Sequence, residues 1–75
     1  MKVGDKVHYI PFDNCHESLF ENGIIKSFAP NGNPFVVYNC NGEWDKIEDY
    51  TAANTPPNML KLGWNSNARN ANFTP

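Results

Sequence analysis

Hydrophobic residues in this chain either alternate with polar ones or form short runs, without the three- and four-residue spacing of an amphipathic helix. The clearest runs, at residues 24–28 and 35–38, are bounded by Gly, Pro and Asn. Short apolar runs between such residues are typical of β-strands. The pattern therefore predicts an all-β fold of five short strands. These are expected at about residues 6–10, 21–28, 34–38, 50–53 and 61–64.

The first strand is expected to have two distinct faces. Successive side chains of a strand point to opposite sides of the sheet, so Val7 and Tyr9 share one face. His8 and Ile10 lie on the other face. Residues 11–20, which begin with a proline, are expected to form a long irregular loop.

Three Asn-Gly pairs punctuate the chain, at Asn22-Gly23, Asn31-Gly32 and Asn41-Gly42. Asn-Gly is the strongest short hairpin signal, because both central residues of a type I′ turn need positive φ. The second and third pairs each separate β-prone runs in that way. The three pairs are predicted to be the corners of an antiparallel meander.

The C-terminal part of the chain carries two further signals. The stretch PPNML, residues 56–60, suits a single 3₁₀ turn with Met59 and Leu60 pointing inward. The last eleven residues, 65–75, contain four Asn and little that could be buried. Such a segment is predicted to be disordered.

The order of these elements resembles that of the SH3-like barrels, including the Tudor and KOW-type subgroup. The likeness is carried by the stretches VGDKV, NGIIKSF, FVVY, PPNML and KLGW, and it covers residues 3–64. It implies a five-stranded SH3-like barrel at residues 1–64, with a 3₁₀ turn before the last strand and a disordered tail at residues 65–75. Proteins of this kind mostly bind peptides, modified side chains or nucleic acid, and they are seldom enzymes.

The chain departs from these families at positions that bear on its ligand. Proline-peptide-binding SH3 domains carry a paired aromatic motif near the end of the first strand, and Tyr9 has no such motif around it. A Tudor-type aromatic cage would require Trp44, Tyr50 and Tyr38 to converge. The chain also resembles small uncharacterised proteins of bacterial and phage origin, a likeness that implies no function.

Size and charge limit the classes of function. A chain of 75 residues suffices for one small, marginally stable domain, so its ten aromatic residues are candidates for the core or for an exposed aromatic surface. The net charge of −2 argues against a protein that holds nucleic acid mainly by neutralising phosphates. The six Lys and Arg residues are scattered singly.

No catalytic or metal-binding apparatus is recognisable. Four potential zinc ligands are present, but they lack the Cys-x-x-Cys spacing of a zinc knuckle. The adjacent Cys15 and His16 have no third group to orient them as a nucleophile and base. No catalytic residue, metal or cofactor is therefore predicted, and an enzyme is the least expected class. The four potential ligands are His8, Cys15, His16 and Cys40.

The N-terminal sequence bears on location. Met1 is followed by a charged, strand-like segment, and no apolar run is long enough to cross a bilayer. The chain is therefore expected to be cytoplasmic. Structural disulfides are uncommon in that compartment, so Cys15 and Cys40 are expected to be reduced, with a bridge between them as the alternative in an oxidising compartment.

The stretch GEWDKIEDY, residues 42–50, combines aromatic and acidic residues. If it forms a helical turn, Trp44, Ile47 and Tyr50 pack inward and the acids face outward. If it is an open loop, Trp44 and Tyr50 lie exposed beside carboxylates. An aromatic and acidic surface suits a cationic partner through cation–π contacts and charge steering.

The sequence is best interpreted as a non-catalytic protein-binding module. Its contact surface would be residues 42–50 with the neighbouring loop 11–20, and its partner a protein with a basic surface. In a phage, such a module would suit an inhibitor of a host nucleic-acid enzyme. The predicted partner-binding residues are Trp44, Asp45, Glu48, Asp49 and Tyr50.

Two alternatives remain open. The first is a KOW- or Tudor-like barrel that binds nucleic acid through Tyr9, Lys26 and Lys61, if these residues meet on one sheet face. The second is an architectural homo-oligomer that pairs through an exposed strand edge. Neither alternative involves a membrane.

Overall fold

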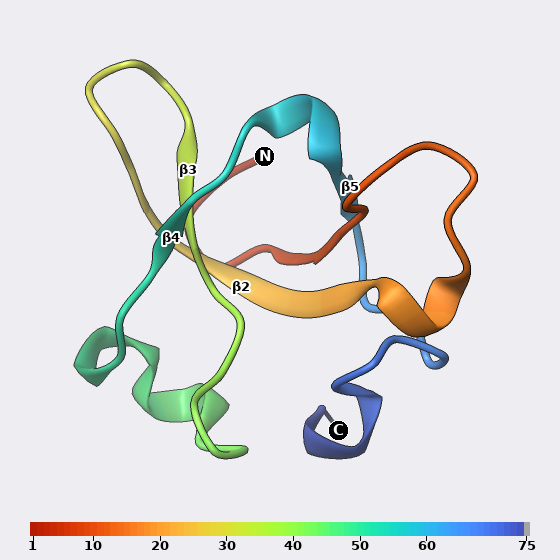
Figure 1. Ribbon diagram of the computed structural model, residues 1–75. Coiled ribbons are helices and arrows are strands. Elements are labelled where there is room, and N and C mark those ends of the chain that lie inside the picture. The colour runs from red at the N-terminus through yellow and green to blue at the C-terminus, as the bar shows by residue number, and fades with distance from the viewer. Residues whose placement is uncertain (75) are drawn as a thin grey trace.

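The computed structural model describes residues 1–74 and shows five antiparallel strands connected by loops and 3₁₀ turns (Figure 1). Pro75, the last residue of the predicted disordered tail, lies outside the described residues. The strands are β1 (Lys6–Tyr9), β2 (Glu21–Phe28), β3 (Pro34–Val37), β4 (Ala53–Asn54) and β5 (Leu60–Leu62). The 3₁₀ turns are η1 (Glu17–Leu19), η2 (Trp44–Asp49), η3 (Pro57–Met59) and η4 (Ala71–Phe73).

The strands form one sheet in the order β4-β3-β2-β1-β5, with β2 at its centre (Figure 1). All four pairings are antiparallel, which confirms the predicted mostly-β architecture of five strands. Over residues 1–74, no ladder joins the two edge strands β4 and β5, so the sheet is open. The prediction of a closed barrel is therefore corrected to a curled, open sheet.

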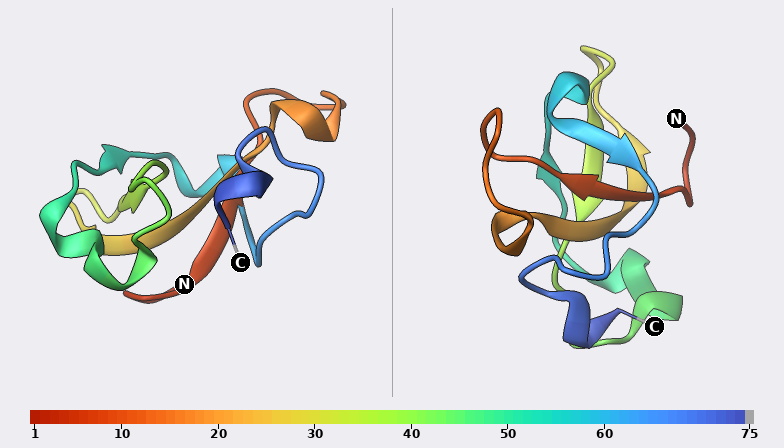
Figure 2. Two further views of the ribbon diagram at one scale, coloured as in Figure 1. Left: turned by 90° about the horizontal axis from the view of Figure 1, so that it is seen from below. Right: turned by 90° about the vertical axis from the view of Figure 1, so that its right-hand side faces the viewer.

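The long central strand β2 bends the sheet. Its first half pairs with β1 and its second half with β3. The register against β3 shifts between Ile25 and Ser27, which leaves Lys26 as an extra residue. Such a bulge bends and twists its strand. The loop before β2 and the turn η2 consequently lie at opposite ends of β2 (Figures 1 and 2).

The main hydrophobic core lies on one face of this sheet. Val7, Ile25 and Val36 are fully buried there, and Leu60 is 6% exposed. Tyr9 packs against this cluster with Tyr38, and the two rings meet edge to face at 5.9 Å between centroids. The prediction that Val7 and Tyr9 share a face is confirmed.

The opposite face is covered by residues 65–74, which the sequence predicted to be disordered. The Arg69 N–H donates to the Phe20 carbonyl at 2.9 Å, and Ala68 is buried. The Asn70 side chain pairs with both the N–H and the C=O of Asn22, each at 2.8 Å. Pairing between β2 and β3 runs only from Ile24 onward, so Asn70 satisfies backbone groups that β3 leaves free. The segment is held by amide hydrogen bonds, which apolar composition does not reveal.

The three Asn-Gly pairs adopt three different conformations. Asn41-Gly42 has φ of 53° and 79°, and Glu43 N–H closes the turn on the Cys40 carbonyl at 2.8 Å, as a type I′ turn requires. At Asn31-Gly32, only the glycine has positive φ. Asn22-Gly23 lies inside β2 and forms no corner. The prediction of three meander corners is therefore wrong for the first pair.

The segment between β3 and β5 confirms one prediction and shifts another. The 3₁₀ turn expected in PPNML is η3, and Leu60 after it is buried. The fourth strand is Ala53–Asn54 instead of residues 50–53. Tyr50 ends η2 and its N–H bonds to the Ile47 carbonyl, so this residue belongs to the turn.

Candidate interaction site

The acidic and aromatic segment folds as the short turn η2. The turn is kinked at Lys46, which has φ −121° and ψ 29°. Trp44, Ile47 and Tyr50 are half-buried, whereas the acids Asp45, Glu48 and Asp49 are exposed. Of the two arrangements left open by the sequence, the structure therefore has the helical turn with its apolar residues packed inward.

Trp44 ties η2 to the C-terminal segment. Its indole N–H donates to the Phe73 carbonyl at 2.6 Å. Its ring packs against Trp64, with centroids 5.1 Å apart, and the Lys6 ammonium lies 4.5 Å from the Trp64 ring centre. Trp44 is thus largely a packing residue, and only part of its ring is available to a partner.

Tyr50 closes the other end of the turn. Its hydroxyl donates to a Glu43 carboxylate oxygen, and this hydrogen bond raises the pKa of the Tyr50 phenol. The Tyr50 carbonyl accepts a hydrogen bond from the Lys26 ammonium at 2.8 Å. The turn is braced at both ends, so the exposed acids lie on an ordered support.

The exposed acids give this surface its charge. Lys46 forms an ion pair with Glu43 at 3.5 Å. Within the described part of the chain, Asp45, Glu48 and Asp49 form no ion pair. Three uncompensated carboxylates on one short turn make a local negative potential, which reaches about 10 Å at 0.1 M salt.

A cavity of about 330 Å³ adjoins the start of η2. Trp44, Tyr38 and Phe73 line it, and Phe73 is 64% exposed. An ion pair between Arg69 and Glu21, with 3.7 Å between the charged atoms, forms part of its wall. The sequence did not indicate this cavity because three of its nine lining residues come from the segment that was expected to be disordered.

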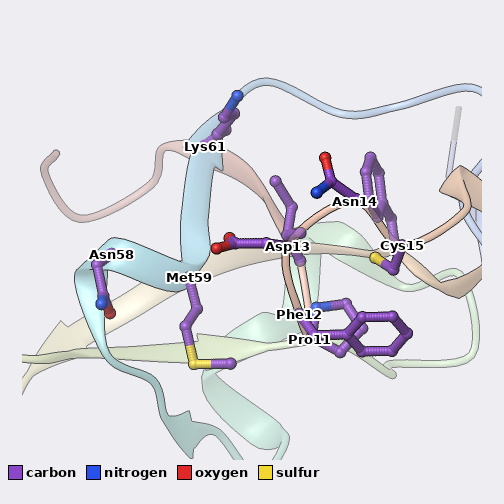
Figure 3. Close-up of a pocket in the computed structure, with 10 residues that line it drawn as sticks. Pro11, Phe12, Asp13, Asn14, Cys15, Asn58, Met59 and Lys61 are labelled. Carbon is purple, nitrogen blue, oxygen red and sulfur yellow. The ribbon is translucent and has the colours of Figure 1, made fainter.

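A larger open groove of about 690 Å³ lies beside the loop before β2, at the end of β2 away from η2 (Figures 1 and 3). Phe12 and Asp13 come from the loop after β1, and Met59 and Lys61 come from η3 and β5 (Figure 3). Cys15 also lines this groove. The loop 11–20 was predicted to neighbour residues 42–50. That prediction is wrong, because the two lie at opposite ends of β2 (Figure 2).

The residues of the nucleic-acid alternative do not meet. Tyr9 packs against Tyr38 on the core face, and Lys26 bonds to Tyr50 beside η2. Lys61 pairs with His8 at the far edge of the sheet, beside the groove. The three residues therefore form no common stacking surface.

The cysteine and histidine side chains are separated as well. Cys15 is partly exposed and Cys40 is buried, and both are free thiols. Burial raises the pKa of the Cys40 thiol. His8 donates from Nδ1 to the Gly63 carbonyl at 2.8 Å, and His16 bonds to Ser18. Over residues 1–74, no three His, Cys, Asp or Glu side chains are grouped to hold a metal ion.

No family model, curated protein or solved structure matches this chain. Among the described residues, no helix is long and apolar enough to span a membrane. The molecule is thus defined by its own geometry, as a small five-stranded antiparallel sheet domain with an acidic turn.

Proposed function

We propose that this chain is a non-catalytic protein-binding module that presents the acids of η2 to a partner with a basic surface. The observation that carries the proposal is the exposure of Asp45, Glu48 and Asp49 on a braced turn, with no ion pair to them from residues 1–74. Charges held this way attract a basic partner over a distance and select against acidic ones.

Trp44 and Tyr50 have a supporting role in this proposal. Both rings are half-buried and both polar groups already have partners within the chain. They order the turn, and a Lys or Arg of the partner that lies over the exposed part of a ring face beside the acids gains a cation–π contact of about 0.5 to 1 kcal/mol. The acids, rather than the aromatics, determine the choice of partner.

As to fold, we propose that the domain is an SH3-like barrel that has remained open between its edge strands. The order β4-β3-β2-β1-β5 and the 3₁₀ turn η3 between β4 and β5 support this assignment. Many proteins of that architecture are binding modules, which agrees with the proposed activity by analogy of fold alone.

The test is a comparison of two variants with the same change of charge. Asp45→Asn with Glu48→Gln removes two acids of η2, and Asp5→Asn with Glu17→Gln removes two acids elsewhere. Proteins retained from a bacterial lysate by each variant are quantified against the wild type, and the recovered partner is then titrated directly. The η2 variant should lose most of the binding and the other variant should keep it. Equal retention by both variants would remove η2 from the binding surface.

A salt titration against a single-stranded oligonucleotide tests the nucleic-acid alternative. Affinity for phosphates falls steeply with salt and would depend on Lys26 and Lys61. Binding that is lost in Lys26→Ala with Lys61→Ala, and kept in the η2 variant, would favour this alternative. A homo-oligomer would instead show as a concentration-dependent mass in sedimentation that neither set of variants changes.

One specific form of the proposal is an inhibitor of a nucleic-acid enzyme in a phage host. The acids of η2 would occupy the basic groove that normally holds nucleic acid. Competition between this protein and an oligonucleotide for the recovered enzyme tests it. Simultaneous binding of both would refute the inhibitor form while leaving the binding module intact.

A further inference from the structure

The three Asn-Gly pairs share a reactive chemistry but lie in different surroundings. Glycine has no Cβ, so its backbone nitrogen can approach the side-chain carbon of the asparagine before it. The reaction needs the asparagine side chain to rotate and the glycine backbone to move. The structure allows this movement at two pairs and opposes it at the third.

We propose that Asn31 and Asn41 are sites of spontaneous deamidation and that the fold protects Asn22. In the first step, the nitrogen of Gly32 or Gly42 forms a bond to Cγ of the preceding asparagine. The Cγ–Nδ2 bond breaks, and the proton from the glycine nitrogen leaves with ammonia. Water then opens the resulting succinimide ring at either carbonyl. The products are aspartate and isoaspartate, with one ammonia released for each water consumed.

Asn22 is held on every side. It is 1% exposed, and its Nδ2 donates to the Asn65 carbonyl at 2.9 Å and to the Thr74 hydroxyl at 3.2 Å. Its Oδ1 accepts from Asn65 N–H at 2.8 Å. Gly23 is paired with Val7, and the position of a Cβ on Gly23 lies only 2.5 Å from a Val36 methyl. Neither reacting group can move without local unfolding.

The other two pairs lie in open turns. Asn31 and Asn41 are exposed. A Cβ position on Gly32 has no heavy atom within 4 Å, and that on Gly42 has only the Phe73 carbonyl at 4.0 Å. Each glycine therefore has space to move toward the asparagine side chain. Two exposed hydrogen bonds at the first turn have to break before reaction, from Gly32 N–H to the Ala29 carbonyl at 2.9 Å and from Asn33 N–H to Asn31 Oδ1 at 3.0 Å.

Deamidation changes the charge of the molecule. Each event replaces a neutral amide by a carboxylate and lowers the net charge of −2 by one. At Asn41 the new carboxylate lies two residues before Glu43, in the turn that leads into η2. Isoaspartate at this position would also lengthen the backbone of the type I′ turn.

The experiment is an incubation of the purified protein at mildly alkaline pH and 37 °C, with tandem mass spectrometry of proteolytic peptides at intervals. A parallel sample is kept in urea, where all three pairs are equally free. In the native sample, Asn31 and Asn41 should convert at least about tenfold faster than Asn22, because reaction at Asn22 must wait for local opening. In urea the three rates should converge.

Two variants sharpen the test. Asn70→Ala removes the side chain that pairs with the Asn22 backbone and should accelerate conversion of Asn22, whereas Asn72→Ala in the same segment should not. Asn31→Gln should abolish conversion at that site, since a glutamine needs a less favourable six-membered ring. Conversion of Asn22 in the native protein as fast as that of Asn31 and Asn41 would overturn the proposal. So would exposed sites that stay intact while the urea sample reacts.

Discussion

At the scale of single residues, the central strand β2 depends on close contacts and hydrogen bonds that the amino-acid composition does not reveal. Gly23 lies where β2 crosses close to β3, and Trp64 donates its indole N–H to the Gly23 carbonyl at 2.8 Å. Asn22 beside it is buried with all its polar atoms satisfied. Both residues were predicted to form a turn because Asn-Gly is common in turns, and here the same dipeptide serves close packing.

Gly23→Ala is expected to destabilise the protein by about 2 kcal/mol or more, because an added methyl group in a packed core forces its neighbours to shift. The new Cβ would lie 2.5 Å from Val36 Cγ1 and 2.8 Å from the Val37 carbonyl oxygen, and the carbonyl belongs to a sheet ladder. Urea denaturation measures the difference. Gly32→Ala places alanine at a φ of 89°, but its Cβ meets no described atom within 4 Å, so it should cost only about 1 kcal/mol. Equal losses in the two variants would contradict the close approach at Gly23.

The raised pKa of Tyr38 predicts that the free energy of unfolding falls at high pH. Burial raises its pKa to about 12, above the value of about 10 for an unfolded chain, although its hydrogen bond with Thr55 acts in the other direction. The neutral phenol is therefore favoured in the folded state. Its contribution to stability is complete below about pH 10 and is lost as the pH rises toward 12.

The measurement for Tyr38 is urea denaturation at several pH values from about 8 to 11.5, on the wild type and on Tyr38→Phe. Lysine titration affects both proteins alike, so the difference between them isolates the phenol. The wild type should lose stability more steeply above about pH 10 than the variant does. Parallel curves would show that Tyr38 is as accessible in the folded protein as in the unfolded one.

At the scale of elements, two tryptophans hold the second face of the sheet together. Trp64 follows β5 and bonds to β2, whereas Trp44 begins η2 and bonds to the C-terminal segment. Their rings contact each other, so they couple η2 to the sheet. The half-buried aromatic residues that the sequence suggested as a binding surface therefore serve mainly to hold these elements together.

The two indole hydrogen bonds should differ in strength. Trp64→Phe removes a hydrogen bond to the carbonyl of buried Gly23, which keeps its ladder partner Val7, and this should cost about 1 to 1.5 kcal/mol. Trp44→Phe leaves the carbonyl of Phe73 at an exposed site, where water replaces the indole, and should cost about 0.5 to 1 kcal/mol. Thermal or urea denaturation of both variants gives the comparison. A larger loss in Trp44→Phe would reverse this assignment.

At the scale of the whole molecule, the open sheet depends on a covering segment. A small domain has little stability beyond what its few buried contacts supply, so the loss of some of them can unfold it. Residues 65–74 cover one face through Asn22, Phe20 and Trp44, so the folded unit extends past the boundary at residue 64 that the sequence suggested.

Removal of residues 65–75 should therefore destabilise the domain severely. Asn22 would lose its side-chain hydrogen bonds to Asn65 and Thr74, each worth about 0.5 to 1.5 kcal/mol, and the sheet face that the segment covers would be exposed to water. We expect the shortened chain to be largely unfolded at 25 °C, as seen by circular dichroism and amide exchange. A cooperative, native-like transition in the shortened chain would show that residues 1–64 fold alone.

The sequence by itself determined the local features. Alternation in VHY placed the first strand and its core face, and the apolar run FVVY placed the third strand. Asn41-Gly42 placed a type I′ turn, and the prolines placed η3. These features depend on residues that are near neighbours in the sequence. Their side-chain periodicity and φ preferences can therefore be recognised from a few consecutive residues. The exposed acids of η2 could be predicted in the same way.

Only the tertiary structure decided the long-range features. The bulge in β2 curls the sheet and separates loop 11–20 from η2. The single contact surface that was predicted from these two segments is therefore two separate surfaces. Asn22 meets Asn70 and Thr74 across about fifty positions of sequence, and those side-chain hydrogen bonds order a segment with little apolar content. Hydrogen bonds of that kind depend on where two distant backbones come to lie, and no pattern in a single stretch specifies it.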